Sequence, residues 1–228
     1  LKLGSDINTG SMGCIVYKDH KLPFLEDEEI LESQELNYNI MRKLSLEGKQ
    51  YKGILYGSFM KTKNGIKLIE YNARFGDPEC LVVLSILKTD LGIIFESICN
   101  QTLDKLNIEY ENKNVICKYL VPEGYPDNPV KNMEVTIPLL EDNMIFAGLK
   151  SVDNKLLLTG SRSLAIVEKG DNMNLIYKSI ETSIKKLNLG LIYRDDIGKV
   201  DLYTESGVNI DEGNKVVERI KDIVSKTY

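Results

Sequence analysis

The chain has 228 residues, of which 43% are hydrophobic, and it carries a formal net charge of −5 with an isoelectric point near 5.2. This length and composition can bury a substantial core, as one large or two small domains. The acidic balance, with no basic run to offset it, excludes a general binder of nucleic acid or of anionic membranes. No stretch is long and apolar enough to span a bilayer, and the N-terminus has no signal-peptide pattern, so we expect a cytoplasmic protein.

The cysteine and histidine content limits the kinds of metal site, disulfide and catalytic mechanism that the protein could have. Cys14, Cys80, Cys99 and Cys117 are widely separated and form no Cys-x-x-Cys pair, which disfavours zinc sites and disulfide frameworks and suits a reducing compartment. The sequence has one histidine, His20, which we expect in a surface loop. Mechanisms that need a pair of histidines are therefore excluded.

Residues 8–13, Asn-Thr-Gly-Ser-Met-Gly, form a glycine-interrupted loop whose N–H groups could cradle an anion. Many ordinary turns share this composition, so both interpretations stay open. Apolar residues at helical spacing then predict a helix from about residue 28 to residue 46, which Gly48 would end.

A β-hairpin is expected next. Residues 53–62 and 66–74 have the pattern of strands, and Lys63-Asn64-Gly65 lies between them. Asn-Gly favours a tight hairpin because both central residues of such a turn need positive φ. The hairpin would fix the register in which the second strand presents its side chains.

The second strand of this hairpin carries the residues best suited to chemistry. Successive side chains of a strand point to opposite faces, so Glu70, Asn72 and Arg74 are expected to share one face. The opposite face, apolar enough to be buried, would carry Ile69, Tyr71, Ala73 and Phe75. Magnesium prefers oxygen ligands, so Glu70 and Asn72 could bind it, while Arg74 could neutralise charge on a phosphoryl or acyl-phosphate group. A solvated strand edge is the alternative interpretation.

The turn after this strand is predicted to open a helix. Asp77 suits an N-cap, Pro78 suits the first helical position, and Glu79 suits the positive end of the helix dipole. Asp77 and Glu79 could thus be helix caps alone. The helix itself is apolar on nearly all sides, which predicts deep burial of Leu81, Val82, Leu84, Ile86 and Leu87.

A second helix is expected to start at Thr89 or Asp90 and to bury Leu91, Ile94, Phe95 and Ile98. Beyond residue 100 the pattern changes to short strands separated by glycine and proline turns, at 115–121, 135–137, 144–147, 156–158 and 164–167, before a helix over 172–187. We therefore predict an α+β fold. Arg162, at the start of a strand, could clamp a substrate phosphate or be an ordinary surface arginine.

Two stretches resemble the glycinamide ribonucleotide synthetase family of ATP-grasp enzymes. These are Gly-Ile-Leu-Tyr-Gly-Ser-Phe-Met at 53–60 and Ile-Glu-Tyr-Asn-Ala-Arg-Phe-Gly-Asp-Pro-Glu at 69–79. The loop at 8–13 resembles the family's Pro-Asn-Thr-Gly-Gly-Met-Gly, with Ile7 in place of proline and Ser11 in place of the second glycine. The segments 88–91, 159–167 and 193–198 also resemble the family, so the similarity covers roughly residues 4–200.

The resemblance implies an ATP-dependent ligase that joins glycine to 5-phosphoribosylamine through a glycyl phosphate. It implies ATP with Mg²⁺ or Mn²⁺ as cofactors, Glu70 and Asn72 as metal ligands, and Arg74 as the catalytic residue. The substrates would be bound by Asn8, Thr9, Gly10, Ser11, Met12, Gly13, Asp77, Glu79 and Arg162. No covalent enzyme intermediate is needed, in keeping with the lack of an activated nucleophile.

The resemblance also predicts the domain organisation. Residues 1–100 would be the C-terminal lobe of an ATP-grasp domain and residues 101–200 the small C-terminal domain of the synthetase. Residues 201–228 resemble the opening of aminoimidazole ribonucleotide synthetase, which suggests a fused purine enzyme. The lobe with the nucleotide-facing lysines would precede Leu1, so we expect the 228-residue chain to bind ATP weakly and to be inactive alone.

Two other functions are compatible with the sequence. A different ATP-grasp carboxylate–amine ligase would keep Glu70, Asn72 and Arg74 and use another amine. A non-catalytic domain, kept as a scaffold for neighbouring purine enzymes, would tolerate the loss of this charged strand. For the ligase, the expected partners are glycine and 5-phosphoribosylamine, the N-terminal lobes of the same protein and the fused aminoimidazole ribonucleotide synthetase domain, with no nucleic acid and no membrane.

Overall fold

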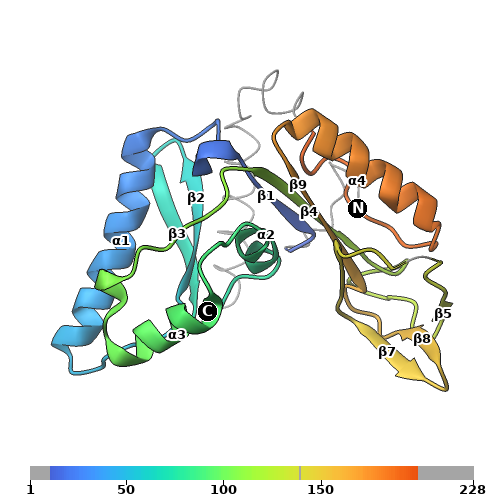
Figure 1. Cartoon of the computed structure of the whole chain (residues 1–228), viewed down its shortest axis with the longest axis horizontal. Coiled ribbons are helices and arrows are strands. Elements are labelled where there is room, and N and C mark those ends of the chain that lie inside the picture. Colours follow the sequence, from blue (N-terminus) through green and yellow to red (C-terminus); the bar gives the residue numbers. More distant parts are fainter. Residues whose placement is uncertain (1–10, 139, 200–228) are drawn as a thin grey trace, which may run out of the picture. The chain divides into compact units, whose positions relative to one another are not determined.

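The computed structural model describes residues 11–138 and 140–199, which form two compact units. The core unit comprises residues 11–21, 77–88, 109–138 and 140–199, and the hairpin unit comprises residues 22–76 and 89–108 (Figure 1). The units follow packing in space, so each collects separate pieces of the sequence. The predicted boundary at residue 100 stays a prediction, and Asn8, Thr9, Gly10 and the tail from residue 200 lie outside the described residues.

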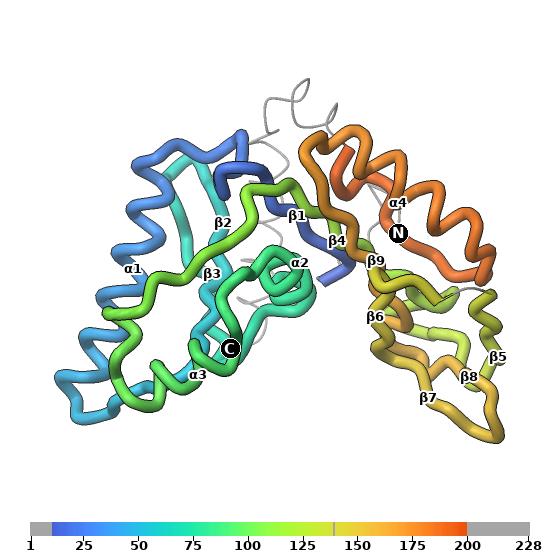
Figure 2. The backbone as a smooth tube through the Cα atoms, in the orientation of Figure 1, coloured from blue at the N-terminus to red at the C-terminus, as the bar shows by residue number. Residues whose placement is uncertain are grey.

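The core unit is built on a four-stranded antiparallel sheet. Its strands are β1 (Gly13–Val16), β4 (Asn114–Leu120), β9 (Leu164–Gly170) and β6 (Met144–Phe146), in the order β1-β4-β9-β6. Figure 2 shows the blue β1 beside the green β4, although about 100 residues separate them in the chain. β1 was not predicted, because four residues are too few to show an alternating pattern.

Helices cover both faces of this sheet. Strand β4 alternates between them: Ile116 and Leu120 pack with α4 (Met173–Leu187), and Val115 and Cys117 pack with α2 (Glu79–Ser85). Every residue of β4 is buried, including the polar Asn114 and the charged Lys118. Each large aliphatic side chain buried here stabilises the fold by about 1.5–3 kcal/mol.

A smaller sheet of three strands completes the core unit, in the order β5 (Glu134–Val135), β8 (Lys155–Leu158) and β7 (Leu149–Val152). Strand β7 was not predicted. It forms because Asp153 and Asn154 both adopt positive φ and turn the chain back into β8. The predicted strands at 115–121, 144–147, 156–158 and 164–167 and the helix over 172–187 are confirmed to within three residues at either end.

The hairpin unit contains α1 (Asp27–Leu46), the antiparallel pair β2 (Tyr56–Thr62) and β3 (Gly65–Asn72), and α3 (Leu91–Asn100). The predicted helix, hairpin turn and second helix are confirmed. Asp90 caps α3 by accepting a hydrogen bond from the Ile93 N–H at 3.1 Å. With the core unit, these elements confirm the predicted α+β class.

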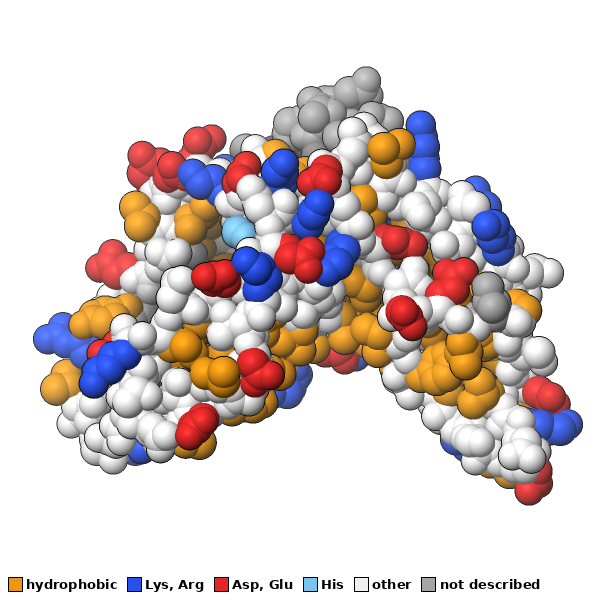
Figure 3. Space-filling view, viewed as in Figure 1, with side chains coloured by type: hydrophobic (Ala, Val, Ile, Leu, Met, Phe, Trp, Pro, Cys, Tyr) orange, Lys and Arg blue, Asp and Glu red, His pale blue; other side chains and the backbone are white. Residues whose placement is uncertain are grey.

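Apolar side chains of the hairpin unit are more exposed than predicted. Among its described residues, Ile66 and Ile94 are the buried hydrophobic ones, whereas Ile69 is 54% exposed and Phe95 is 43% exposed. Figure 3 shows apolar side chains at the surface over α1 and α3. The prediction that the Ile69 face of β3 is buried was wrong, because an alternating sequence does not determine whether another element covers the apolar face.

The helix after Pro78 is also less buried than its sequence indicated. Val82 and Ile86 are buried against the sheet, but Leu81, Leu84 and Leu87 are only half-buried. His20 is exposed, as predicted, and contacts Tyr110 edge to face with ring centroids 5.8 Å apart. No helix in the described ranges 11–138 and 140–199 is long and apolar enough to cross a membrane.

Candidate functional site

Strand β3 places Glu70 and Asn72 side by side. The Asn72 Nδ2 donates a hydrogen bond to Glu70 Oε1 at 2.8 Å, so the two side chains lie on one face, as predicted. The ladder explains why: Ser58 of β2 pairs with Glu70, and Tyr56 pairs with Asn72. A register shift leaves Ile69 without a partner, and this bulge falls just before the polar pair.

The donor set of this pair suits a hard cation. A carboxylate and an amide supply oxygen ligands, and Mg²⁺ commonly takes one or two such ligands from protein and the rest from water and phosphate. Glu70 is exposed and Asn72 is half-buried, so a phosphate could approach them. Among the described residues, no three His, Cys, Asp or Glu side chains gather as a metal site. Any cation held here would therefore need ligands beyond Glu70 and Asn72.

Arg74 lies beyond the end of β3, not within it. The strand ends at Asn72, and the exposed Arg74 donates from Nη1 to the carbonyl oxygen of Phe75 at 2.7 Å. The prediction of a strand through residue 74 was wrong, because the partner strand β2 starts at Tyr56, opposite Asn72, and offers no further ladder bonds. The guanidinium is consequently positioned by a bend and not by the sheet.

In the core unit, three predicted site residues meet at one point. Arg162 Nη2 contacts Asp77 Oδ2 at 2.6 Å, and Arg162 Nη1 donates to the carbonyl oxygens of Ser11 at 3.0 Å and Asp77 at 3.2 Å. The contacts join positions 85 and 151 residues apart in the chain. Arg162 is therefore not an ordinary surface arginine.

Asp77 does not cap the following helix. Pro78 occupies the N-cap position of α2 without a side-chain cap bond, and Glu79 is the first helical residue. The Asp77 carboxylate instead binds Arg162, whose planar fork of charged donors is a stronger partner than a backbone N–H. Glu79 is half-buried, and its charge and that of Asp77 add to burial in raising the pKa of the Cys80 thiol.

Tyr119 was missed by the sequence reasoning. Its hydroxyl donates to Asp77 Oδ1 at 3.0 Å, and its ring lies 4.5 Å from the Arg162 guanidinium carbon, within range of a cation–π contact. Burial, followed by the bond to Asp77, raises the pKa of this phenol. The available signal was a tyrosine within a predicted strand, since a buried tyrosine hydroxyl usually has a hydrogen-bond partner.

The described part of the predicted anion loop is anchored to β4. Met12 is buried, and its carbonyl oxygen accepts the Tyr119 N–H at 2.9 Å, while Ser11 is exposed with φ of +67°. Glycine adopts this left-handed conformation without steric cost. Ser11 is therefore strained at a position where the similar loop of the synthetase family has glycine.

Gly13 is required by close packing. A Cβ on Gly13 would lie 2.3 Å from the carbonyl oxygen of Cys117 and 2.8 Å from Ile197 Cδ1. We expect Gly13→Ala to destabilise the 228-residue chain by about 3 kcal/mol, because backbone atoms cannot move aside without parting β1 from β4. Urea unfolding measures this loss.

Gly190→Ala is the control for Gly13→Ala. Gly190 has φ of +67° and open space around its Cα, so this variant carries conformational strain without a clash and should cost about 1 kcal/mol. Equal losses in the two variants would show that the close approach to β4 does not matter.

Two thiols also meet on the β1–β4 pair. Cys14 lies directly opposite Cys117, and both thiols are free. The hydrogen bond between them, together with burial, raises the pKa of Cys14 well above its ordinary value. Since the thiolate is the reactive form, this shift makes Cys14 less reactive than an ordinary cysteine.

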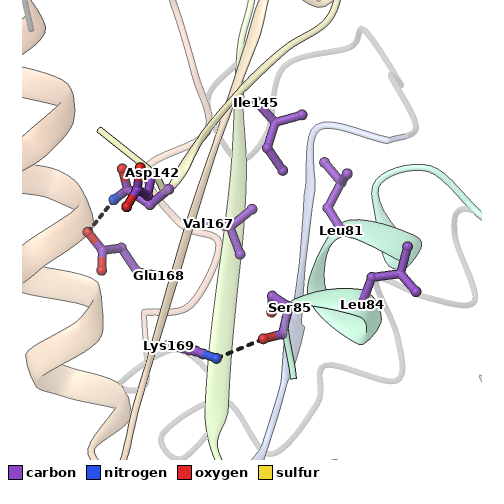
Figure 4. A pocket seen from close by; sticks show the side chains of 9 residues that line it. Leu81, Leu84, Ser85, Asp142, Ile145, Val167, Glu168 and Lys169 are labelled. Atoms are coloured by element: carbon purple, nitrogen blue, oxygen red, sulfur yellow. Dashed lines mark hydrogen bonds between the residues drawn. The ribbon is translucent and has the colours of Figure 1, made fainter. Parts of the chain in front are cut away.

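A cavity of about 540 Å³ lies elsewhere in the core unit, between α2 and the β6–β9 edge of the sheet (Figure 4). Leu81, Leu84, Ile145 and Val167 give it a largely apolar wall, and the Lys169 ammonium is bound to the Ser85 carbonyl oxygen at 2.8 Å. None of the predicted site residues lines this cavity. It is consequently separate from the candidate site.

Comparisons with known proteins match two parts of the chain to one family. Residues 4–80, which include the Glu70 strand, match the family described as phosphoribosylglycinamide synthetase, ATP-grasp (A) domain. Residues 115–200, which include Tyr119 and Arg162, match the phosphoribosylglycinamide synthetase C domain. The chain belongs to the phosphoribosylglycinamide synthetase family. The resemblance predicted from the motifs is thereby confirmed.

Relatives of this family cover most of the chain. The phosphoribosylamine–glycine ligase of Methanococcus maripaludis strain S2 is 40% identical over 220 residues, 94% of this chain and 47% of the relative. That of Methanocaldococcus jannaschii is 41% identical over 199 residues, 85% of this chain and 45% of the relative. The crystal structure of the Thermotoga maritima ligase matches with a TM-score of 0.70 at 28% identity, over 86% of this chain and 49% of that chain. The chain thus spans about half the length of these relatives.

Proposed function

We propose that the chain contributes to an ATP-dependent ligase that joins glycine to 5-phosphoribosylamine, giving glycinamide ribonucleotide for purine synthesis. The observation that carries the proposal is the Glu70–Asn72 pair, joined at 2.8 Å on an exposed strand within the ATP-grasp match. Paired oxygen donors followed by an arginine suit a phosphate with its metal better than they suit a protein core. The names of the relatives supply the two substrates.

The reaction would proceed through activation of a carboxylate. ATP would transfer its γ-phosphoryl group to the glycine carboxylate and leave as ADP. The amine of phosphoribosylamine would then attack the carbonyl carbon of the glycyl phosphate, and phosphate and a proton would be released. Glu70 and Asn72 would hold Mg²⁺ or Mn²⁺, which supplies positive charge to the phosphates when bound. The Arg74 guanidinium would donate to the oxygens that gain charge in the transition state. Catalysis would rest on position and charge, as is usual in phosphoryl transfer.

We assign recognition of the amine substrate to Asp77 and Glu79. Asp77 and Glu79 would accept hydrogen bonds from phosphoribosylamine, and the loop of residues 8–13 would bind substrate anions through its N–H groups. No side chain needs to form a covalent bond with substrate.

The complete enzyme would need segments beyond these 228 residues. We propose that a nucleotide-binding lobe accompanies this chain in the natural protein, and that the aminoimidazole ribonucleotide synthetase-like tail marks a fused cytoplasmic purine enzyme. The test is ADP release by the complete natural protein with glycine and phosphoribosylamine. Turnover only with another amine would assign a different ATP-grasp ligase, and no turnover with any amine would favour the scaffold alternative.

Arg74→Lys tests the assigned catalytic charge. Lysine keeps the positive charge but lacks the planar fork of donors, so we expect kcat in the complete protein to fall about a hundredfold. The KM for ATP should change much less, because the lost interaction forms mainly in the transition state. Arg42→Lys, on α1, is the matched control, and an equal effect of the two substitutions on kcat would contradict the assignment.

A further inference from the structure

The positively charged side chain of Arg162 is already paired with groups of the protein itself. Its two terminal nitrogens contact Asp77 Oδ2 at 2.6 Å, the Asp77 carbonyl oxygen at 3.2 Å and the Ser11 carbonyl oxygen at 3.0 Å. The Arg162 side chain is 20% exposed. A guanidinium with a carboxylate this close is largely neutralised, and most of its donors are used. It is poorly suited to hold a substrate phosphate as well.

The Asp77 carboxylate is held from two directions. Arg162 binds Oδ2, and the Tyr119 hydroxyl donates to Oδ1 at 3.0 Å. Tyr119 is 3% exposed and cannot turn away, and its ring lies against the same guanidinium. The Asp77 side chain itself is 41% exposed, and each carboxylate oxygen can accept a second hydrogen bond.

We propose that Arg162 and Tyr119 are positioning residues that fix Asp77 as the acceptor for a primary amine of the substrate, and that Arg162 does not bind the substrate's anionic group. The inference rests on the proposed ligase function and changes the role first predicted for Arg162. A carboxylate fixed in this way accepts an N–H bond without first losing side-chain freedom, which is how preorganised groups favour a bound geometry.

The same contacts connect Asp77 to the loop at Ser11. Arg162 reaches the Ser11 carbonyl oxygen, and the Tyr119 N–H reaches the Met12 carbonyl oxygen at 2.9 Å. The Tyr119–Arg162 pair therefore holds both the candidate amine acceptor and the first described residues of the candidate anion loop. Loss of the pair should loosen both segments.

The kinetic test uses Tyr119→Phe, Arg162→Lys and the double variant in the complete natural protein. We expect each single change to lower kcat/KM for the amine substrate about tenfold, with the KM for ATP and for glycine unchanged. The double variant should lose little more than either single one, because both residues act through Asp77. Tyr177→Phe is the control: its hydroxyl donates to the Asp195 carbonyl oxygen at 2.9 Å and does not contact Asp77.

Two results would overturn the proposal. One is an unchanged amine KM and kcat in Tyr119→Phe. The other is inhibition by inorganic phosphate that weakens tenfold or more in Arg162→Ala and stays normal in Tyr119→Phe, since that pattern would make Arg162 an anion-binding residue.

Amide hydrogen exchange in the 228-residue chain separates this proposal from the proposed function. Tyr119→Phe and Arg162→Lys should each speed exchange in peptides spanning 11–20 and 77–85, whereas Tyr177→Phe should leave those peptides unchanged. If the wild-type protein releases no ADP with any amine, the ligase proposal fails, and the exchange data still decide whether the pair holds Asp77. Unaltered exchange in both variants would then overturn the positioning role.

Discussion

Glu70→Gln should reduce magnesium-dependent turnover of the complete natural protein about a thousandfold. Glutamine keeps the shape of the side chain and an oxygen that can accept the Asn72 hydrogen bond, which measures 2.8 Å in the wild type. It removes the negative charge that would attract a divalent cation, and a correctly held cation contributes several kcal/mol to stabilising the charge of a phosphoryl-transfer transition state. Coupled measurement of ADP release against Mg²⁺ concentration tests this expectation.

The dependence of turnover on metal concentration shows whether Glu70→Gln loses activity through a missing metal ligand or through a damaged fold. If Glu70 binds the cation, the Glu70→Gln variant should need a higher concentration of Mg²⁺ or Mn²⁺ for half-maximal turnover, because a neutral amide binds a hard cation more weakly than a carboxylate does. Glu96→Gln, an exposed position on α3 of the same unit, is the matched control and should leave the metal dependence unchanged. If Glu70→Gln turns over as fast as the wild type at limiting Mg²⁺, Glu70 is not a ligand of the metal.

Lys118→Met should give the largest loss of stability. Lys118 is fully buried on the α4 face of β4, with its ammonium bound to Glu181 Oε1 at 2.7 Å and to the Asp195 carbonyl oxygen at 3.2 Å. It also lies 4.5 Å from the centre of the Tyr177 ring. Methionine would leave the Glu181 carboxylate, 12% exposed, without its counter-ion. Removal of one partner of a buried pair costs about 3–5 kcal/mol, which urea unfolding of the chain can measure.

The double variant Lys118→Met/Glu181→Leu shows whether the pair itself stabilises the fold. Burial lowers the pKa of Lys118, and the bond to Glu181 only partly opposes this effect. The ion pair therefore offsets only part of the desolvation penalty. We expect the double variant to regain most of the stability lost by Lys118→Met. A double variant that stays as unstable as the single one would mean that the pair is strongly net stabilising.

Elements with local signals were predictable from the sequence. The period of α1, the Asn-Gly turn of the hairpin and the Asp90 cap of α3 each depend on residues within a few positions of one another. The Glu70–Asn72 pair was predicted for the same reason, since two residues separated by one position share a face of a strand.

Features that depend on distant partners were not predictable. Asp77 has the sequence context of a helix cap, yet Arg162, 85 residues later, binds its carboxylate. Lys118 is buried in spite of its charge because Glu181, 63 residues later, accepts its hydrogen bond. The bulge at Ile69 was hidden as well, because a register shift depends on the opposite strand and leaves no mark in the alternation.

The three-segment make-up of the core unit limits how this protein can be divided or recombined in evolution. Strand β1 and helix α2 come from before residue 90, whereas the other strands of the sheet and helix α4 come from after residue 110. A gene break near residue 100 would leave β4 with an open edge and an uncovered apolar face at Val115 and Cys117. Such surfaces promote aggregation, so we expect the halves of this chain to be inherited together and not as exchangeable modules.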